Sequence, residues 1–546
     1  MFKKYLFLFL IIIISLIPLI DLFRSGLPLT HDGQDHVARI ANFYQNLLEG
    51  NIIPRWAGNL NWGYGHPILE FLYPLPSYLA SFFHFVGFSL VDGVKLVFGI
   101  SYILSALTMY FFVKELLNDN KAAFLASALY IVAPYRFVDL YVRGAIGEHV
   151  AFIFPPLIFY FLLKLSKKYS WWFLVGGAVS LAGLNLSHNA ISLMFMPLFA
   201  LFALFLIATS KKRVQLTSFF LVIAILGFGL SAFFWIPAFM EGKYTLRDVV
   251  TGGGEYLQSF VIWKDFFFSD WSYGGTLSLS KQMGILHWIG ILGAFAATYY
   301  LYIKKDKLGI VSCISLIIFF TTLFLMTSQS DFIWQTITTL QKFQFPWRFL
   351  SLTVFISALL GAIVFHIVPN KLKKISLLIL VVGLLIANKD YFYANGFLQK
   401  EESFYTGVYN GTTDTGESAP IWSVRFMEKR PKARMEVISG KAQVKEIKRT
   451  MTVHNYEIVV SEKARILENT LYFPGWVVLA NGKNTDIQFQ DQNHRGLITF
   501  YLDKGKYDVE IIYKETKVRQ LSNTLSFLSL VIVGGSFLSL IKKKTV

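Results

Sequence analysis

The chain has 546 residues, of which 54% are hydrophobic, 17% aromatic and only 16% charged, and its mean hydropathy of +0.51 excludes an ordinary soluble globular domain. The net charge of +17 lies in short basic clusters between long apolar runs, which is typical of the cytoplasmic loops of a membrane protein and not of nucleic-acid binding. The one cysteine, Cys313, excludes disulfides and cysteine metal sites within the chain.

Apolar runs of about 18 to 22 residues recur along the chain and are long enough to cross a membrane as helices. The predicted fold class is therefore a polytopic α-helical membrane protein. Lysine and arginine concentrate in cytoplasmic loops, and the basic clusters accordingly place both termini on the cytoplasmic side. Twelve spans are expected, at residues 5–23, 92–113, 121–138, 148–165, 170–187, 190–209, 214–238, 283–303, 308–326, 346–367, 373–392 and 522–541.

Two outer segments differ from simple loops. Residues 68–88 would begin and end on the outer side, so we expect helices that lie in the interface. Stretches such as NYEIVVS and KYDVEIIYK alternate apolar and polar residues, and Asn481-Gly482 is a hairpin signal, which predicts a sandwich-like β domain before the last span. The expected domains are a transmembrane domain at 1–392 with an outer loop at 24–91, an extracytoplasmic β domain at 393–521, and a last span with a cytoplasmic tail at 522–546.

The stretch LTHDGQDHVAR, at residues 29–39, concentrates charge directly after the first expected span. Asp32 and Asp35 are three residues apart and would share the first turn of a helix that begins near residue 30. Capping of that helix explains one acid more easily than two and leaves His31 and His36 unexplained. A weakly held divalent ion is a second interpretation, although this spacing matches no standard metal motif.

Other ionisable residues also fall on the outer side in this topology, and such groups at membrane depth favour a function. Arginine and lysine there could hold the anionic head of a lipid-linked phosphosugar, and an aspartate could take the proton of an acceptor hydroxyl. His188 is more readily interpreted as a helix cap or a satisfied interfacial histidine than as a catalyst, and Trp347 or Tyr64 as aromatic anchors at the interface. The candidate phosphate-binding residues are Arg55, Arg143, Lys342 and Arg348, and the candidate substrate-binding residues are His31, His36, Tyr64, His188 and Trp347.

A first span followed at once by an acidic motif, and a second acid at the start of a later outer segment, resemble the GT-C superfamily of integral-membrane glycosyltransferases. Within it, the motifs resemble a bacterial family of membrane proteins with a "6-pyruvoyl-tetrahydropterin synthase-related" domain, a label that does not imply pterin chemistry. The motifs are HDGQDHVAR, PRW, GYGHP, YPLPSYL, YVRGAIGEH, FPWRF and YFPGW. The resemblance covers nearly the whole chain, and the order of the motifs is more specific than any one of them.

The resemblance implies transfer of a sugar from a polyprenyl-phosphate donor to an acceptor in the cell envelope, at the outer face of the bacterial plasma membrane. It places the catalytic base at Asp32 or Asp35 and a supporting acid at Glu148. We favour Asp32, with Asp35 in a positioning role or holding an ion. The resemblance leaves open a divalent cofactor, Mg²⁺ or Mn²⁺ at Asp32 and Asp35, or none. The alternative functions are a transporter or flippase of lipid-linked saccharides and a non-catalytic glycan-binding scaffold.

Overall fold

The computed structural model describes residues 2–252, 254–274 and 279–542. These residues form two compact units, each built from three separate stretches of the chain. Unit 1 comprises Met1–Gly33, Val94–Leu230 and Gly254–Gln399, and unit 2 comprises Gln34–Gly93, Ser231–Gly253 and Lys400–Val546.

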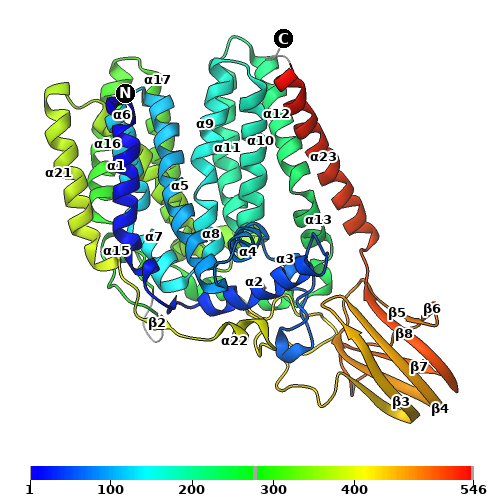
Figure 1. Ribbon diagram of the computed structural model, residues 1–546. Coiled ribbons are helices and arrows are strands. Elements are labelled where there is room, and N and C mark those ends of the chain that lie inside the picture. Colours follow the sequence, from blue (N-terminus) through cyan, green and yellow to red (C-terminus); the bar gives the residue numbers. More distant parts are fainter. Residues whose placement is uncertain (1, 253, 275–278, 543–546) are drawn as a thin grey trace. The chain divides into compact units, whose positions relative to one another are not determined.

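Unit 1 is a bundle of long apolar helices (Figure 1). Its longer helices are α1 (Phe2–Leu16), α5 (Leu90–Leu117, whose first residues belong to unit 2), α6 (Asn120–Ile131), α9 (Phe154–Lys167), α10 (Trp171–Ser187), α11 (Asn189–Thr209), α12 (Arg213–Leu230), α16 (Ile285–Ile303), α17 (Lys307–Leu325), α20 (Leu350–His366) and α21 (Asn370–Asn388). Its short elements are η1 (Ile17–Phe23), β1 (Leu27–Pro28), α7 (Pro134–Phe137), η3 (Val138–Arg143), α8 (Ile146–Ala151), η5 (Glu255–Ser259), α15 (Trp263–Phe267), η6 (Ser328–Ser330), α18 (Asp331–Thr336), α19 (Thr338–Gln341), η7 (Pro346–Phe349), η8 (Lys389–Tyr391) and β2 (Phe397–Leu398).

The prediction of a helical membrane protein is confirmed. In the part of the chain that the structure describes, eight helices are long and apolar enough to cross a membrane, or nine if a bent pair counts as one span. Three expected spans are not among these eight. The span at 170–187 corresponds to α10, which is apolar but shorter than the eight helices. The spans at 373–392 and 522–541 correspond to α21 and α23 (Lys517–Lys542). The count of twelve spans stays a prediction.

Two of the expected spans are interrupted. The helix predicted at 121–138 is bent by 48° after Ile131 and continues as a buried helical segment to Arg143, so the residues expected as an outer loop are helical. The span predicted at 214–238 ends at Leu230, and α13 (Ala232–Met240) begins a new helix in unit 2. Gly227, Gly229 and Ser231 are weak helix formers within five residues, which favours a break there.

Helix α20 lies in the interior of unit 1. Nearly all of its side chains are buried, and it packs against α6, α16 and α17. Its polar residues Ser351, Thr353 and Ser357 donate to backbone carbonyl groups one turn earlier, so they are satisfied without water. The rigid central helix begins directly after η7, which carries Trp347 and Arg348.

Unit 2 combines short helices with an antiparallel β-sheet. Its helices are α2 (Gly33–Leu48), η2 (Asn61–Gly63), α3 (Ile68–Phe71), α4 (Leu75–Phe85), α13, η4 (Gly242–Tyr244), α14 (Arg247–Thr251), α22 (Glu402–Thr406) and α23. Its strands are β3 (Met435–Arg449), β4 (Val453–Leu471), β5 (Trp476–Ala480), β6 (Lys483–Thr485), β7 (Leu497–Leu502) and β8 (Gly505–Tyr513).

The predicted β domain is confirmed as an antiparallel sheet, with strand order β3-β4-β8-β5-β6 and β7 paired with β4. All six strands belong to one connected sheet, because β4 has 19 residues and pairs with β8 through its first half and with β7 through its second. The sandwich-like arrangement stays a prediction. The Asn481-Gly482 hairpin is confirmed. Both residues have positive φ, 49° and 75°, and they connect β5 to β6 in register.

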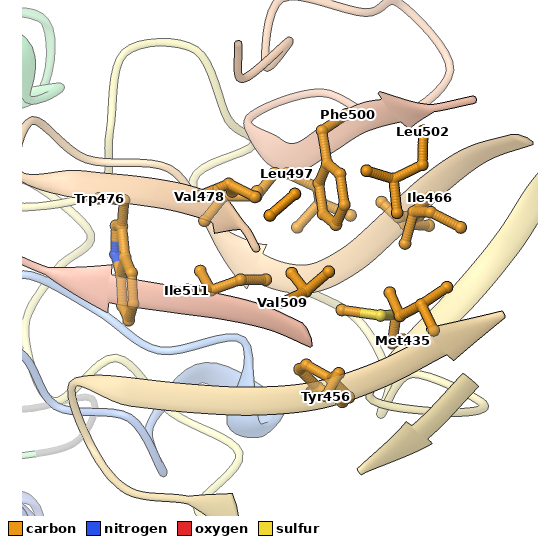
Figure 2. Close-up of a cluster of buried hydrophobic side chains, with 14 of the residues drawn as sticks. Met435, Tyr456, Ile466, Trp476, Val478, Leu497, Phe500, Leu502, Val509 and Ile511 are labelled. Carbon is orange, nitrogen blue, oxygen red and sulfur yellow. The ribbon is translucent and has the colours of Figure 1, made fainter. Parts of the chain in front are cut away.

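Side chains from five strands form the hydrophobic core of this domain (Figure 2). Phe500 and Leu502 of β7 and Val509 and Ile511 of β8 meet in one cluster. Trp476 is 3% exposed and belongs to this core, where its ring packs edge-to-face against Trp56 at 5.3 Å. Burial of these aromatic rings anchors the chain near residue 56 to the sheet.

Candidate functional site

The start of the acidic motif is held by the backbone at the end of η3. The amides of His31 and Asp32 donate to the carbonyl oxygens of Val142 and Arg143, each at 2.9 Å. Thr30 Oγ1 accepts from the amide of Gly33 at 3.1 Å, which confirms a role for residue 30 at the start of α2. Residues distant in sequence are thereby placed side by side within unit 1.

Asp32 itself is exposed. Within the described residues, no side chain pairs with its carboxylate. The neighbouring His31 donates through Nε2 to the carbonyl oxygen of Tyr273, 2.9 Å away. A fixed backbone with a carboxylate that is free to meet a ligand is the geometry that a general base needs.

Glu148 is the centre of a buried group of charges in unit 1. Its side chain is 0% exposed, and its Oε1 lies 2.9 Å from Arg143 Nη2 and 3.4 Å from Arg348 Nε. Tyr135 donates its hydroxyl to Glu148 Oε2 at 2.8 Å. Arg143 also reaches Asp139, with 2.7 Å between Nη1 and Oδ1. Two arginines and two acids balance in formal charge, which favours the burial of Arg143, Asp139 and Glu148, while Arg348 keeps 15% of its side chain exposed.

The local backbone explains why these groups meet. Val138–Arg143 is a π-helix, and it ends at Gly144 in the left-handed conformation with φ 69°. Ala145 then donates to the carbonyl oxygen of Asp139 at 2.8 Å, and α8 begins at the next residue. Because the chain reverses its path within a few residues, Arg143 at the end of η3 and Glu148 at the start of α8 face each other. Turns of this kind are frequent at functional sites.

Two further predicted residues complete this group. His188 caps α11, since its Nδ1 accepts from the amide of Ile191 at 3.3 Å, and its Nε2 lies 3.8 Å from Glu148 Oε1. The expected capping role is confirmed. Trp347 is 7% exposed, and the guanidinium of Arg143 lies over its ring at 4.7 Å. It is therefore a buried partner of the arginine.

Arg348 and Lys342, two of the predicted phosphate-binding residues, differ in their contacts. Arg348 Nη1 donates to the carbonyl oxygen of Phe343 at 2.9 Å, and its guanidinium lies over the ring of Phe345 at 4.9 Å. Lys342 is exposed, and no carboxylate among the described residues pairs with it. Both cations lie on the segment that leads into α20.

The second half of the acidic motif belongs to unit 2 and has partners there. Tyr409 donates its hydroxyl to Asp35 Oδ1 at 2.7 Å and accepts from Gln34 Nε2 at 2.8 Å. His36 Nδ1 lies 2.9 Å from Arg39 Nη1, and the Nε of Arg39 donates to the hydroxyl of Thr413 at 3.1 Å. The first turns of α2 thus bind the segment near residues 409–413.

Arg55 and Tyr64 also lie in unit 2. Arg55 is 4% exposed, and it pairs with Glu515 at 2.9 Å and donates to Asn523 Oδ1 at 2.9 Å and to the carbonyl of Phe233 at 3.2 Å. These contacts give Arg55 a role inside the protein in place of a free phosphate ligand. Tyr64 packs against the core of the β domain.

The described residues contain no group of three or more His, Cys, Asp and Glu side chains that could hold a metal ion. Asp32 would offer an ion one carboxylate, and Asp35 is engaged by Tyr409. This donor set does not fit a tightly bound divalent cation, which takes several oxygen ligands from protein or substrate.

The sequence assigned no site role to three residues that contact the predicted ones. Asp139 stood out as a polar residue beside Arg143, and its spacing of four residues could have indicated the pair. Tyr135 and Tyr409 carry no local signal, because their roles depend on partners that the fold brings to them.

A sequence model of membrane proteins with a 6-pyruvoyl-tetrahydropterin synthase related domain matches residues 69–394, more than half of the chain and including Arg143, Glu148, His188 and Arg348. The chain belongs to this family. A relative, an uncharacterized protein of Lactococcus lactis subsp. cremoris strain MG1363, is 28% identical over 257 residues. This match covers 45% of the chain and 42% of the relative, so the chain spans less than half of the relative's length.

Two solved structures resemble this member of the 6-pyruvoyl-tetrahydropterin synthase related family. The arabinofuranosyltransferase AftD from mycobacteria is 13% identical with a TM-score of 0.43, over 71% of this chain and 26% of that one. An oligosaccharyltransferase from Archaeoglobus fulgidus, in complex with zinc and sulfate, is 15% identical with a TM-score of 0.45, over 77% and 59% of the two chains.

Proposed function

We propose that this membrane protein is a glycosyltransferase that moves a sugar from a polyprenyl-phosphate donor to an acceptor hydroxyl at the outer face of the plasma membrane. One observation carries the proposal. The exposed carboxylate of Asp32 stands on a backbone that is hydrogen-bonded to Val142 and Arg143, and the side chain of Arg143 belongs to the buried charge group of Glu148.

Asp32 is the general base of the proposed reaction. The motif alone does not decide between Asp32 and Asp35, although we favour Asp32, and the surroundings of the two acids support this choice. Asp35 accepts a hydrogen bond from Tyr409, which occupies one of its carboxylate oxygens. Asp32 has no such partner among the described side chains, so it is the acid that can approach an acceptor hydroxyl.

Arg348 and Lys342 are the groups proposed to hold the donor phosphate. The charges of Arg143, Arg348, Asp139 and Glu148 cancel, so the excess positive charge comes from Lys342. Arg348 has a planar guanidinium that can bind a phosphate oxygen through Nη2, because Nη1 donates to Phe343 and Nε faces Glu148. Lys342, exposed on the same segment before α20, adds a second positive charge.

The reaction follows from these groups. The acceptor oxygen attacks the anomeric carbon of the donor sugar and a new carbon–oxygen bond forms, while the bond from that carbon to the phosphate oxygen breaks. The bonding electrons leave with polyprenyl phosphate, whose charge the cations stabilise, so no acid has to protonate it. Asp32 takes the proton of the acceptor hydroxyl.

Glu148 acts as a positioning residue in this mechanism. Its carboxylate is fully buried and contacts Arg143, Arg348 and Tyr135, so it orients the two guanidinium groups and does not meet the substrate. Fixed charges of this kind contribute to catalysis because they need no rearrangement during the reaction.

The test is complementation of a strain that lacks this protein, with mass spectrometry of its envelope glycans and lipid-linked sugars. Asp32→Asn is expected to leave the modification absent and to accumulate the polyprenyl phosphosugar, at normal protein levels in the membrane. Asp35→Asn is the matched control and is expected to retain part of the modification. If Asp32→Asn decorates the envelope as the wild type does, Asp32 is not the base.

A further inference from the structure

A polar cavity lies at the opposite end of unit 1 from the candidate site. It has a volume of about 610 Å³ and is lined by Phe7, Asn118, Asp119, Asn120, Lys121, His366, Val368, Pro369, Asn370 and Lys373. These residues come from α1, from the start of α6 and the residues before it, from the end of α20, and from the start of α21 with the residues before it. Helix α6 packs against both α1 and α21 (Figure 1). The cavity therefore lies within one packed group of helices.

One wall of the cavity is an ion pair. Asp119 Oδ2 contacts the ammonium of Lys373, and His366 Nδ1 lies 3.2 Å from the same oxygen. Burial opposes the ionisation of Asp119, but hydrogen bonds from Lys373 and from the amide of Ala122 hold the pKa of this carboxyl below its ordinary value. The acid is therefore charged, and it neutralises one of the two lysines of the cavity.

The remaining charge in the cavity is positive. Lys121 has no carboxylate partner among the described residues. Helix α21 begins at Asn370 after Pro369, and no side chain caps its first turn, so its amides leave a partial positive charge at this end. The amides of Asn118, Asn120 and Asn370 provide further polar groups. A cation, an uncapped helix start and neutral amides around one cavity fit a phosphate group.

Apolar side chains flank this polar cavity on two helices. On α1, Tyr5 and Phe9 are 51% and 56% exposed on either side of Phe7. On α21, Leu372 and Ile375 are 46% and 53% exposed within the first two turns. A phosphate that is bound here would have hydrophobic surface beside it, which suits the acyl chains of a lipid and not a free ion.

We propose that this cavity binds the phosphate headgroup of an anionic phospholipid, in the membrane leaflet on the basic side of the protein. The basic residues of the neighbouring connections would attract such lipids to this side. The cavity would then hold the phosphate group of one of these lipids. This inference concerns a second site and does not depend on the proposed glycosyltransferase activity.

The full-length protein in detergent, with native mass spectrometry as the readout, tests this proposal. Phosphatidylglycerol is expected to bind more tightly than phosphatidylcholine, and Lys121→Ala is expected to weaken phosphatidylglycerol binding about tenfold. Lys371→Ala is the matched control, because it removes the same charge from an exposed position outside the cavity, and it is expected to leave binding unchanged.

A second variant changes binding in the opposite direction. Asp119→Asn keeps a residue that caps α6 well and releases Lys373, so the affinity for phosphatidylglycerol is expected to rise severalfold. Equal losses in Lys121→Ala and Lys371→Ala would show that diffuse surface charge attracts the lipid, and the cavity would not be a site. Displacement of the lipid by millimolar inorganic phosphate would assign the site to a soluble phosphate and overturn the lipid.

Discussion

The backbone amide of Asp32 donates a hydrogen bond to the carbonyl oxygen of Arg143, with 2.9 Å between nitrogen and oxygen. This bond ties the acidic motif after the first helix to the turn that carries the buried arginine. A shift of either segment would move the proposed base relative to the cations. Misplacement by about 1 Å can reduce a rate by about a hundredfold, so the turn is as important as the charged side chains.

Gly144→Ala is expected to disturb this contact. Gly144 has φ 69°, and an added Cβ would overlap Thr30 Oγ1, so both the backbone and the Asp32 loop would have to move. Transfer activity is expected to fall by about tenfold to a hundredfold, measured on envelope glycans at matched protein levels. Gly50→Ala is the control, because Gly50 also has a positive φ but faces open space. Equal activity in both variants would contradict the role of the turn.

Tyr409→Phe tests the assignment of Asp35 as a positioning residue. The substitution removes the hydroxyl that donates to Asp35 at 2.7 Å and leaves the aromatic ring. A hydrogen bond to a charged group contributes about 1.5–3 kcal/mol, so the first turns of α2 should exchange amide hydrogens faster. Hydrogen exchange of peptides from residues 34–48 in the full-length protein is the measurement.

The same variant also separates the two aspartates in activity. Transfer by Tyr409→Phe should fall to the level of Asp35→Asn and stay above that of Asp32→Asn. A complete loss of transfer in Tyr409→Phe, with unchanged exchange in α2, would indicate that Asp35 or Tyr409 meets the substrate directly.

Hydropathy and local pattern predicted most of the fold. The apolar runs predicted the helices of unit 1, and two residues, Asn481 and Gly482, predicted a hairpin to the exact turn. The broken helix before Arg143 was not predicted, because a bend inside an apolar run changes neither its length nor its composition. The extent of β4 was not predicted either. This strand pairs with β8 and then with β7, and the alternation of apolar and polar residues does not specify which strands pair.

The candidate site was predictable where the free-energy cost of a charged residue at membrane depth indicates a function. Arg143 and Glu148 were singled out because charges at membrane depth need partners, and the structure pairs them with each other. Arg55 looked equivalent, yet its partner Glu515 is 460 residues away in the sequence. No local pattern distinguishes a buried ion pair of this kind from a free ligand-binding arginine.

Glu468 gives unit 2 a dependence on acid pH. Burial opposes its ionisation, but the hydrogen bond from His454 and the charge of Arg449 hold the pKa of Glu468 at about 2, against 4.5 ordinarily. A lowered pKa stabilises the fold above about pH 4.5, and this stabilisation is lost as the pH falls from there towards 2. Each unit of pKa corresponds to about 1.4 kcal/mol, so ionised Glu468 contributes about 3 kcal/mol to the free energy of unfolding.

The measurement is hydrogen exchange in β4 of the full-length protein between pH 7 and pH 3, corrected for intrinsic rates. Glu468→Gln is expected to exchange faster at pH 7 and to show little further change on acidification. Glu462→Gln is the control on the same strand, because Glu462 is 58% exposed in a surface pair with Lys441. A wild-type profile in Glu468→Gln would show that other groups determine the acid sensitivity.

Glu70 is expected to have the opposite effect in the same unit. It is 0% exposed, its Oε2 lies 2.8 Å from Arg519 Nη2, and the same nitrogen lies 2.6 Å from Glu241. One arginine faces two acids, so the pair holds a proton. Burial is the largest cause that raises the pKa of Glu70, to about 8, although the charge of Arg519 opposes it.

Because the folded state keeps this proton and the unfolded state releases it near pH 4.5, the free energy of unfolding falls as the pH rises from about 4.5 to 8. At pH 7 the loss is on the order of 3 kcal/mol. Glu70→Gln replaces the protonated acid with a neutral amide of similar shape, so peptides covering α3 and α13 should exchange more slowly at pH 8 than in the wild type. The two proteins should converge near pH 5. Glu401→Gln, at an exposed position, should leave the wild-type pH dependence unchanged. Faster exchange in Glu70→Gln at pH 8 would instead mean that Glu70 is ionised beside Arg519 and stabilises the fold as a carboxylate.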